Sequence, residues 1–112
     1  MYNPPQAKEW KAAVQDQGRP YRPAKPLSGP LSVTLEFRLP RPKRLQRKKD
    51  PEGKIPHDVK PDRDNLEKAI LDALTNDGWW GDDCQVCAGE VEKFYAPKGA
   101  PPGVWVTIKS VK

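Results

Sequence analysis

The apolar and polar positions of the chain alternate most clearly between Leu31 and Leu39, where every second residue is apolar. A period of two places those apolar side chains on one face, so this segment is predicted to be a half-buried strand. Residues 85–95 and 103–111 are predicted as two further strands, separated by a loop rich in proline and glycine. We expect these last two strands to form a hairpin.

Two segments show the spacing of helices instead. Residues 6–14 form a short predicted helix. A second helix is predicted from Leu66 to about Thr75, and Gly78 follows it as a C′ glycine would. Its apolar residues recur at i, i+3, i+4, i+7 and i+8: Leu66, Ala69, Ile70, Ala73 and Leu74. The order of elements predicts an α+β fold, in which a small, mainly antiparallel sheet packs with two helices.

The length of the chain, 112 residues, corresponds to a single domain spanning 1–112 with one modest core. Its net charge of +5 indicates a polyanionic partner. No apolar run approaches the ~20 residues of a membrane span, and the polar start lacks the pattern of a signal peptide. We therefore expect a cytoplasmic protein with no membrane partner.

Basic residues concentrate in the segment 40–61. Residues 41–49 include six basic residues and no acidic one: Arg41, Lys43, Arg44, Arg47, Lys48 and Lys49. A run of like charges cannot pack against itself, so we expect a mobile basic loop. The loop is either a solubilising surface segment or an arm that grips DNA phosphates, and its position beside a group of carboxylates favours the arm.

Two pairs of aspartates flank the second helix, with Asp62 and Asp64 before it and Asp82 and Asp83 after it. Side chains spaced i, i+2 at a helix start can converge on one point, and the chain after Gly81 could return the second pair beside the first. Each pair also has a structural explanation, because aspartate is common at N-caps and in turns. Converging carboxylates in a basic protein favour a hard divalent cation, with Mg²⁺ as the leading candidate.

Two cysteines and two tryptophans are the remaining candidates for chemistry. Cys84 and Cys87 form one C-x-x-C, but a zinc site needs about four ligands and His57 is the only histidine. We expect two reduced thiols without a metal or redox role. At least one of Trp79 and Trp80 is expected in the core or a subunit interface, and stacking on an unpaired base is the alternative.

The segment that begins at His57 carries a longer motif. It reads His57-x-x-Lys60-Pro61-Asp62-x-Asp64-Asn65-Leu66-x-Lys68-x-x-x-Asp72-Ala73-Leu74, followed by Trp80-x-Asp82-Asp83-x-Gln85-Val86. This motif resembles the RusA family of Holliday-junction resolvases, which are common on phages and prophages. The resemblance implies a RusA-like fold. It also implies a homodimeric, Mg²⁺-dependent endonuclease that cuts four-way DNA junctions symmetrically in recombination and repair.

The resemblance further implies the roles of single residues. Asp62, Asp64 and Asp83 correspond to the metal-binding aspartates, and Lys68 corresponds to the catalytic lysine. Three residues are candidates for supporting roles: Asn65, Asp82 and His57. The residues expected to bind DNA are basic: Arg41, Lys43, Arg44, Arg47, Lys48, Lys49, Lys60 and Arg63.

The chemistry of phosphodiester hydrolysis agrees with these roles. One or two Mg²⁺ ions, with Mn²⁺ as a substitute, would activate a water molecule and polarise the phosphate. Lys68 would stabilise the pentacovalent phosphate or orient the water. His57 would contact a phosphate or transfer a proton, or it is a loop residue held by hydrogen bonds.

The start of the chain departs from the family pattern. Family members usually begin with an apolar, proline-containing strand, whereas Met1–Pro5 leads directly into the first helical region, so we expect that strand to be missing. The alternative function is a non-catalytic, junction-binding dimer, as a decayed or truncated nuclease. An RNA-binding module is disfavoured because no RNP-type aromatic motif is present. An active enzyme is expected near the nucleoid of a bacterium or phage-infected cell.

Overall fold

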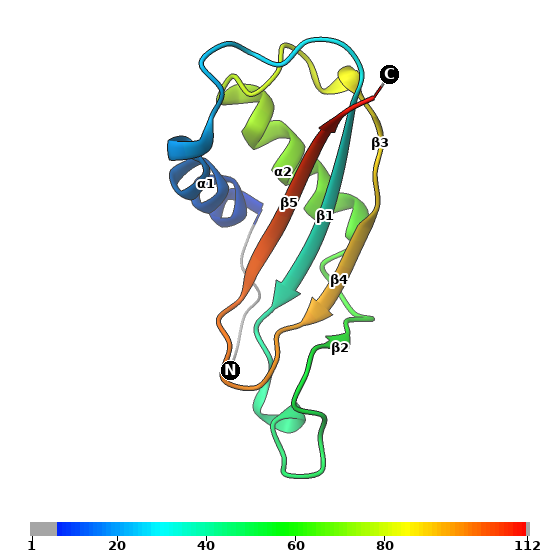
Figure 1. The fold of residues 1–112 in the computed structure, drawn as a ribbon. Coiled ribbons are helices and arrows are strands. Elements are labelled where there is room, and N and C mark those ends of the chain that lie inside the picture. Colours follow the sequence, from blue (N-terminus) through cyan, green and yellow to red (C-terminus); the bar gives the residue numbers. More distant parts are fainter. Residues whose placement is uncertain (1–6, 112) are drawn as a thin grey trace.

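The computed structural model describes residues 7–111, and it shows two layers, a five-stranded sheet and a pair of helices (Figure 1). The helices and strands are α1 (Ala7–Gly18), β1 (Leu31–Leu39), β2 (Ile55–Pro56), α2 (Arg63–Asn76), β3 (Val86–Ala88), β4 (Val91–Tyr95) and β5 (Gly103–Ser110). Three short 3-10 turns lie in the connections: η1 (Arg19–Tyr21), η2 (Lys43–Leu45) and η3 (Asp83–Gln85). The predicted α+β class is confirmed. The expectation about Met1–Pro5 lies outside the described residues.

The sheet is mixed, and β1 is its central strand. β5 pairs antiparallel with one edge of β1, from Leu31 opposite Ser110 to Arg38 opposite Gly103. β3 and β4 pair parallel with the other edge of β1, and β2 adds a short antiparallel pair outside β4. The predicted hairpin of the last two strands is therefore wrong. β1 lies between β4 and β5, so residues 96–102 pass the end of β1 instead of making a tight turn.

The predicted strand 85–95 is divided at Gly89. This glycine has a φ of 123°, and a Cβ atom at this position would lie 1.9 Å from the carbonyl oxygen of Val33. Only glycine tolerates this conformation and this close approach of two backbones. The division leaves β3 and β4 as two short strands that follow the same edge of β1 in succession.

The core lies between the helices and one face of β1. The apolar residues predicted from the alternation of β1 are all buried on this face: Leu31, Val33, Leu35, Phe37 and Leu39. Trp10 of α1 meets Phe37 edge to face, with ring centroids 5.5 Å apart. Trp80 is buried as well, and its indole Nε1 donates to Thr75 Oγ1 at 2.7 Å, which confirms a core position for one of the two tryptophans.

The outer edge of β5 is open. Within residues 7–111, β5 pairs with β1 alone, and an apolar groove of about 970 Å³ separates it from α1. Val104, Val106 and Ile108 line this groove on the sheet side. In the same range, no helix is long and apolar enough to cross a membrane.

Candidate active site

The start of α2 presents two carboxylates to solvent. Asp62 occupies the N-cap position with an extended backbone (φ −68°, ψ 148°), yet its side chain makes no capping hydrogen bond. Asp64 lies in the first helical turn, and both side chains are exposed. Neither carboxylate has a hydrogen bond or ion pair within the described residues. The carboxylate oxygens are therefore not used in helix capping, and the positive end of the helix dipole favours their negative charge.

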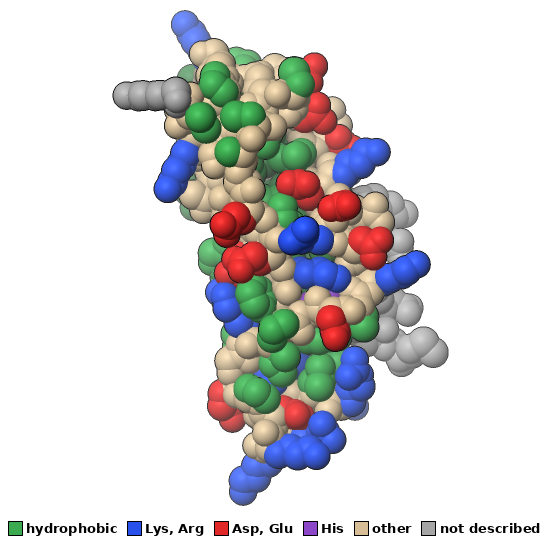
Figure 2. Space-filling view, turned by 90° about the vertical axis from the view of Figure 1, so that its right-hand side faces the viewer, with side chains coloured by type: hydrophobic (Ala, Val, Ile, Leu, Met, Phe, Trp, Pro, Cys, Tyr) green, Lys and Arg blue, Asp and Glu red, His purple; other side chains and the backbone are tan. Residues whose placement is uncertain are grey.

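Asp64 also lines a shallow cleft of about 430 Å³ between α2 and the β3–β4 junction. The cleft contains four acidic side chains and one basic one: Asp64, Glu67, Glu90, Glu92 and Arg63. Figure 2 shows acidic side chains spread over the middle of this side of the molecule, with Lys and Arg between them. A phosphate that approaches this cleft would meet net negative charge unless a cation comes with it.

Asp82 has a structural role at the opposite end of α2. Its Oδ1 accepts from the Cys84 amide at 2.9 Å, and the Gln85 Oε1 accepts from the amides of Gly81 and Asp82 in return. This capping box starts η3, and the bond from the Cys84 amide lowers the pKa of Asp82. The structural interpretation of the second aspartate pair is a turn, and Asp82 instead has the role of a cap. Cys84 and Cys87 are both free and exposed.

Asp83 faces other carboxylates. Its pKa is raised, first by a hydrogen bond shared with Asp82, then by desolvation and by the negative charges of Asp82 and Asp72. Asp72 lies on α2 and pairs with Lys11 of α1 at 3.5 Å. Asp83 therefore lies beside the second half of α2, and a cation near it would relieve the repulsion.

The four aspartates do not form one cage in the described chain. No group of three or more His, Cys, Asp or Glu side chains among residues 9–111 is close enough to hold a metal ion. The predicted convergence of the two pairs is therefore not observed. Asp64 and Asp72 are eight residues apart on α2, about 12 Å along the axis at 1.5 Å per residue.

The donors present still fit one kind of metal site. Mg²⁺ keeps several waters and is commonly held by one or two carboxylates together with substrate phosphates, without an all-protein cage. Asp62 and Asp64 are two such carboxylates, and both are free to bind. A closed site made of protein ligands alone does not fit the described residues.

Lys68 follows Asp64 by four residues, so both side chains project from the same face of α2. Lys68, Asn65 and Lys60 are exposed, and their side chains have no hydrogen bond or ion pair within the described chain. Arg63 is exposed as well and makes one long contact, from its Nη1 to the Val91 carbonyl at 3.5 Å. These residues are thus available to a ligand at the start of α2.

His57 is buried, with 7% of its surface exposed. Its ring lies 4.6 Å from the Tyr95 ring, and its amide donates to the Lys93 carbonyl at 3.2 Å. Burial and then the charge of Lys93 lower the pKa of His57, so the imidazole is neutral near pH 7. The imidazole Nδ1 is buried without a hydrogen-bond partner in the described residues, so the ring is held by packing and not by hydrogen bonds of its own.

The basic loop 40–61 projects from one end of the molecule, where Lys and Arg side chains gather (Figures 1 and 2). Arg41 is buried, and its guanidinium donates to three carbonyls of the loop: Leu45 at 2.7 Å, Pro51 at 2.6 Å and Gly53 at 3.2 Å. The expectation that this segment does not pack is therefore wrong for Arg41. Its donors satisfy loop carbonyls that water would otherwise solvate, so its side chain is not available to DNA.

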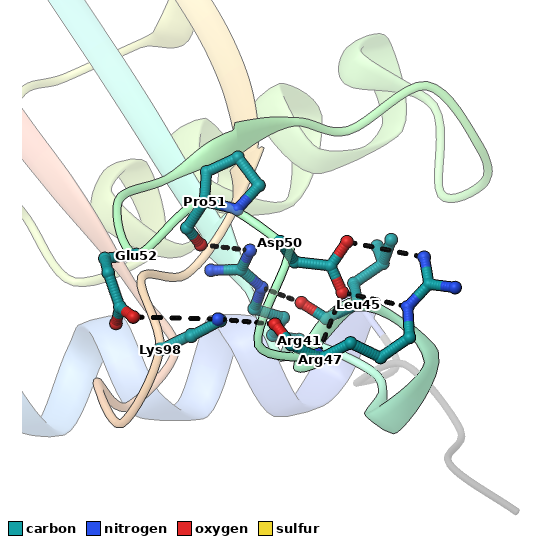
Figure 3. Close-up of polar contacts among 7 residues, drawn as sticks. All are labelled: Arg41, Leu45, Arg47, Asp50, Pro51, Glu52 and Lys98. Atoms are coloured by element: carbon teal, nitrogen blue, oxygen red, sulfur yellow. Dashed lines mark hydrogen bonds and ion pairs between the residues drawn. The ribbon is translucent and has the colours of Figure 1, made fainter.

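Other contacts hold the tip of this loop (Figure 3). Arg47 makes a two-pronged ion pair with Asp50, at 3.1 and 3.3 Å, and holds the pKa of Asp50 below its ordinary value. Lys98 donates to the Arg47 carbonyl at 2.6 Å from outside the loop. Apart from the paired Arg47, four cations of residues 41–49 are exposed: Lys43, Arg44, Lys48 and Lys49. Arg44 alone among them has a contact in the described residues, a 3.4 Å bond to the Tyr95 hydroxyl.

Lys93 is not among the site residues predicted from the sequence. Its Nζ donates to the carbonyls of Val59 and Pro61, and Pro61 immediately precedes Asp62. A signal for it was present, because Val91, Lys93 and Tyr95 alternate on one face of β4 and two of the three are suited to a core.

Similarity to known proteins extends over almost the whole chain. The endodeoxyribonuclease RusA family matches residues 1–109. "Uncharacterized protein YqaN" of Bacillus subtilis (strain 168) is 33% identical over 116 residues, which cover 99% of this chain and 79% of YqaN. Two proteins named crossover junction endodeoxyribonuclease RusA, from Escherichia coli (strain K12) and Enterobacteria phage 82, are each 47% identical over 45 residues. Those 45 residues cover 40% of this chain and 38% of each RusA protein. The extent of the family match shows that this chain belongs to the RusA endodeoxyribonuclease family.

Proposed function

We propose that this chain is a metal-dependent endonuclease that resolves four-way DNA junctions. The observation that carries the proposal is the start of α2, where Asp62 and Asp64 are exposed and unpaired within the described chain and Lys68 follows one turn later. Nucleases of this family are metal-dependent in general. Two relatives are named crossover junction endodeoxyribonucleases, which makes branched DNA the proposed substrate.

Asp62 and Asp64 would hold Mg²⁺, or Mn²⁺ in its place, together with water and phosphate oxygens. When bound, the ion would activate a water molecule and polarise the scissile phosphate. The Lys68 ammonium would stabilise the negative charge that builds on the phosphate, and the positive end of α2 would add to it. This pair suffices for one hydrated ion, and a second ion would require Asp83 to approach the pair.

The partners follow from the same chemistry. The exposed cations of the basic loop would bind phosphates of the junction arms, while Lys60 and Arg63 would bind phosphates near the scissile bond. A four-way junction offers two symmetry-related strands, and a homodimer would present two sites to cut them. We place this activity in recombination and repair, in the cytoplasm close to the nucleoid.

One observation favours the alternative, a junction-binding dimer that does not cut. Asp83 lies beside Asp72 and Asp82 and is not grouped with Asp62 and Asp64, so a three-carboxylate site is not assembled in the described chain. A protein that binds junctions through its basic loop would need no such site.

A labelled four-way junction separates the two functions. Wild type and two variants, Asp64→Asn and the control Asp16→Asn, would be incubated with it in the presence and absence of Mg²⁺ or Mn²⁺. Asp16 is an exposed aspartate of α1 outside the site, so its loss changes the net charge equally. Metal-dependent cutting by wild type and Asp16→Asn but not by Asp64→Asn supports the nuclease. Binding without cutting by all three supports the alternative, and absence of binding contradicts both.

A further inference from the structure

The two free carboxylates depend on an approach segment, residues 57–62, that is itself held by β4. The Lys93 ammonium donates to the carbonyls of Val59 and, at 2.8 Å, Pro61. The Pro61 carbonyl belongs to the peptide bond that Pro61 forms with Asp62. A single side chain thus fixes the backbone on the N-terminal side of the first proposed ligand.

The register of the sheet explains how Lys93 reaches this segment. Lys93 lies opposite Phe37 in the parallel pairing of β4 with β1, and Phe37 faces the helices. The Lys93 side chain therefore leaves the sheet on the helix-covered face and is only half exposed. An ammonium in such a place needs acceptors, and the two carbonyls supply them.

Neighbouring residues of β4 hold the same segment on either side. Tyr95 packs on the buried His57 ring at the beginning of the segment. The Val91 carbonyl accepts a long contact from Arg63, the first residue of α2, at 3.5 Å. Three alternate residues of β4 therefore fasten the approach segment and the first residue of α2, and Lys93 is the central one.

We propose that Lys93 is a positioning residue for metal binding. By fixing the backbone before Asp62, it determines where the carboxylates of Asp62 and Asp64 lie. This inference rests on the proposed nuclease function. Lys93 does not act on the phosphate, because its donors are directed at Val59 and Pro61, whereas the Lys68 ammonium has no partner within the described chain. Residues that orient a metal ligand change metal affinity or activity by about 10- to 100-fold when they are replaced.

Three variants test the proposal. Lys93→Met removes the donors and keeps a similar side-chain length, while Lys93→Arg keeps a charged group with several donors. Lys109→Met is the control for the lost charge, because Lys109 is an exposed lysine of β5 whose side chain has no hydrogen bond or ion pair within the described chain.

The first readout is cleavage of the junction as a function of Mg²⁺. Lys93→Met should cut about 10- to 100-fold more slowly at limiting Mg²⁺ and recover as Mg²⁺ is raised, because misplaced carboxylates bind the ion more weakly. Junction affinity without metal and its salt dependence should stay as in wild type. Lys93→Arg should recover most of the rate, and Lys109→Met should resemble wild type.

The second readout is amide hydrogen exchange without metal or DNA. Lys93→Met should speed exchange in residues 57–66 and leave α1 and β5 unchanged. This readout does not depend on cutting, so it tests the hold on the segment even if wild type proves inactive and the nuclease proposal fails.

Several results would overturn the proposal. Cutting by Lys93→Met with the wild-type Mg²⁺ requirement would exclude a positioning role. If the slope of log K against log salt for junction binding fell by about 0.9 in Lys93→Met, with unchanged amide exchange in residues 57–66, Lys93 would be a phosphate contact instead. Faster exchange across the whole chain would make it a general stabilising residue.

Discussion

Arg41→Met should destabilise the basic loop far more than a change at any of the exposed cations around it. Arg41 is 8% exposed and donates to three carbonyls of its own loop. A hydrogen bond to a charged group contributes about 1.5–3 kcal/mol, so three such bonds set an upper bound of about 4.5–9 kcal/mol. Pro51 and Gly53 are exposed, so water can replace the lost donors at two of the carbonyls. In the variant no guanidinium has to be desolvated on folding, which offsets part of this loss. We therefore expect the free energy of unfolding to fall by about 2–4 kcal/mol.

The assay is urea denaturation of wild type, Arg41→Met and the control Lys48→Met, combined with hydrogen exchange of residues 45–53. Lys48 is exposed in the same loop, and its replacement should change the free energy of unfolding by about 0.5 kcal/mol or less. Arg41→Met should instead lower the free energy of unfolding. If the loop opens without unfolding the rest of the chain, the amides of residues 45–53 should exchange faster while those of the core stay protected. Equal stability and equal exchange in Arg41→Met and Lys48→Met would refute the structural role.

Three further predictions concern the site. Asp64→Asn should abolish Mg²⁺-dependent cutting while a binding assay shows equal or tighter junction affinity, because one repulsive charge is removed; a tenfold loss of affinity in a folded variant would contradict this. Asp83→Asn should melt at or above the wild-type temperature in EDTA, since the pKa of Asp83 is raised by Asp82 and Asp72; a lower melting temperature would make its charge stabilising. The pKa of His57 is lowered in the folded state, so its neutral ring contributes stability above pH 6.5, and this contribution is lost as the pH falls. Thermal melts at falling pH should therefore show a smaller loss of stability in His57→Phe than in wild type. Parallel losses in the two proteins would show that His57 does not cause the acid sensitivity.

Local patterns of the sequence predicted the parts of the fold that are decided locally. The alternation of β1 predicted which of its faces is buried, and the spacing of Leu66, Ile70 and Leu74 predicted the buried face of α2. These patterns work because a strand and a helix repeat their side chains at fixed periods. The family motif added the candidate ligands Asp62 and Asp64. The structure shows that both side chains are exposed and that Asp62 makes no capping hydrogen bond.

Pairing between distant segments was not predictable in the same way. β4 and β5 each alternate as a hairpin strand would, and nothing local to them shows that both pair with β1. Arg41 resembles its basic neighbours in sequence, and only the fold of residues 45–53 around it makes it a buried donor. Lys93 is a comparable case, because its role depends on carbonyls more than 30 residues earlier in the chain.

The charges of the molecule separate binding from cutting. Lys43, Arg44, Lys48 and Lys49 cluster on the basic loop at one end of a molecule 48 Å long, whereas the cleft beside Asp64 is acidic. A turn of B-DNA spans about 34–36 Å, so one duplex arm is long enough to touch the basic loop and reach α2. The loop attracts phosphates, whereas the cleft repels them until a cation neutralises it. Changes in the loop should therefore act on affinity and its salt dependence, and changes at Asp62 and Asp64 should act on cutting and its metal dependence.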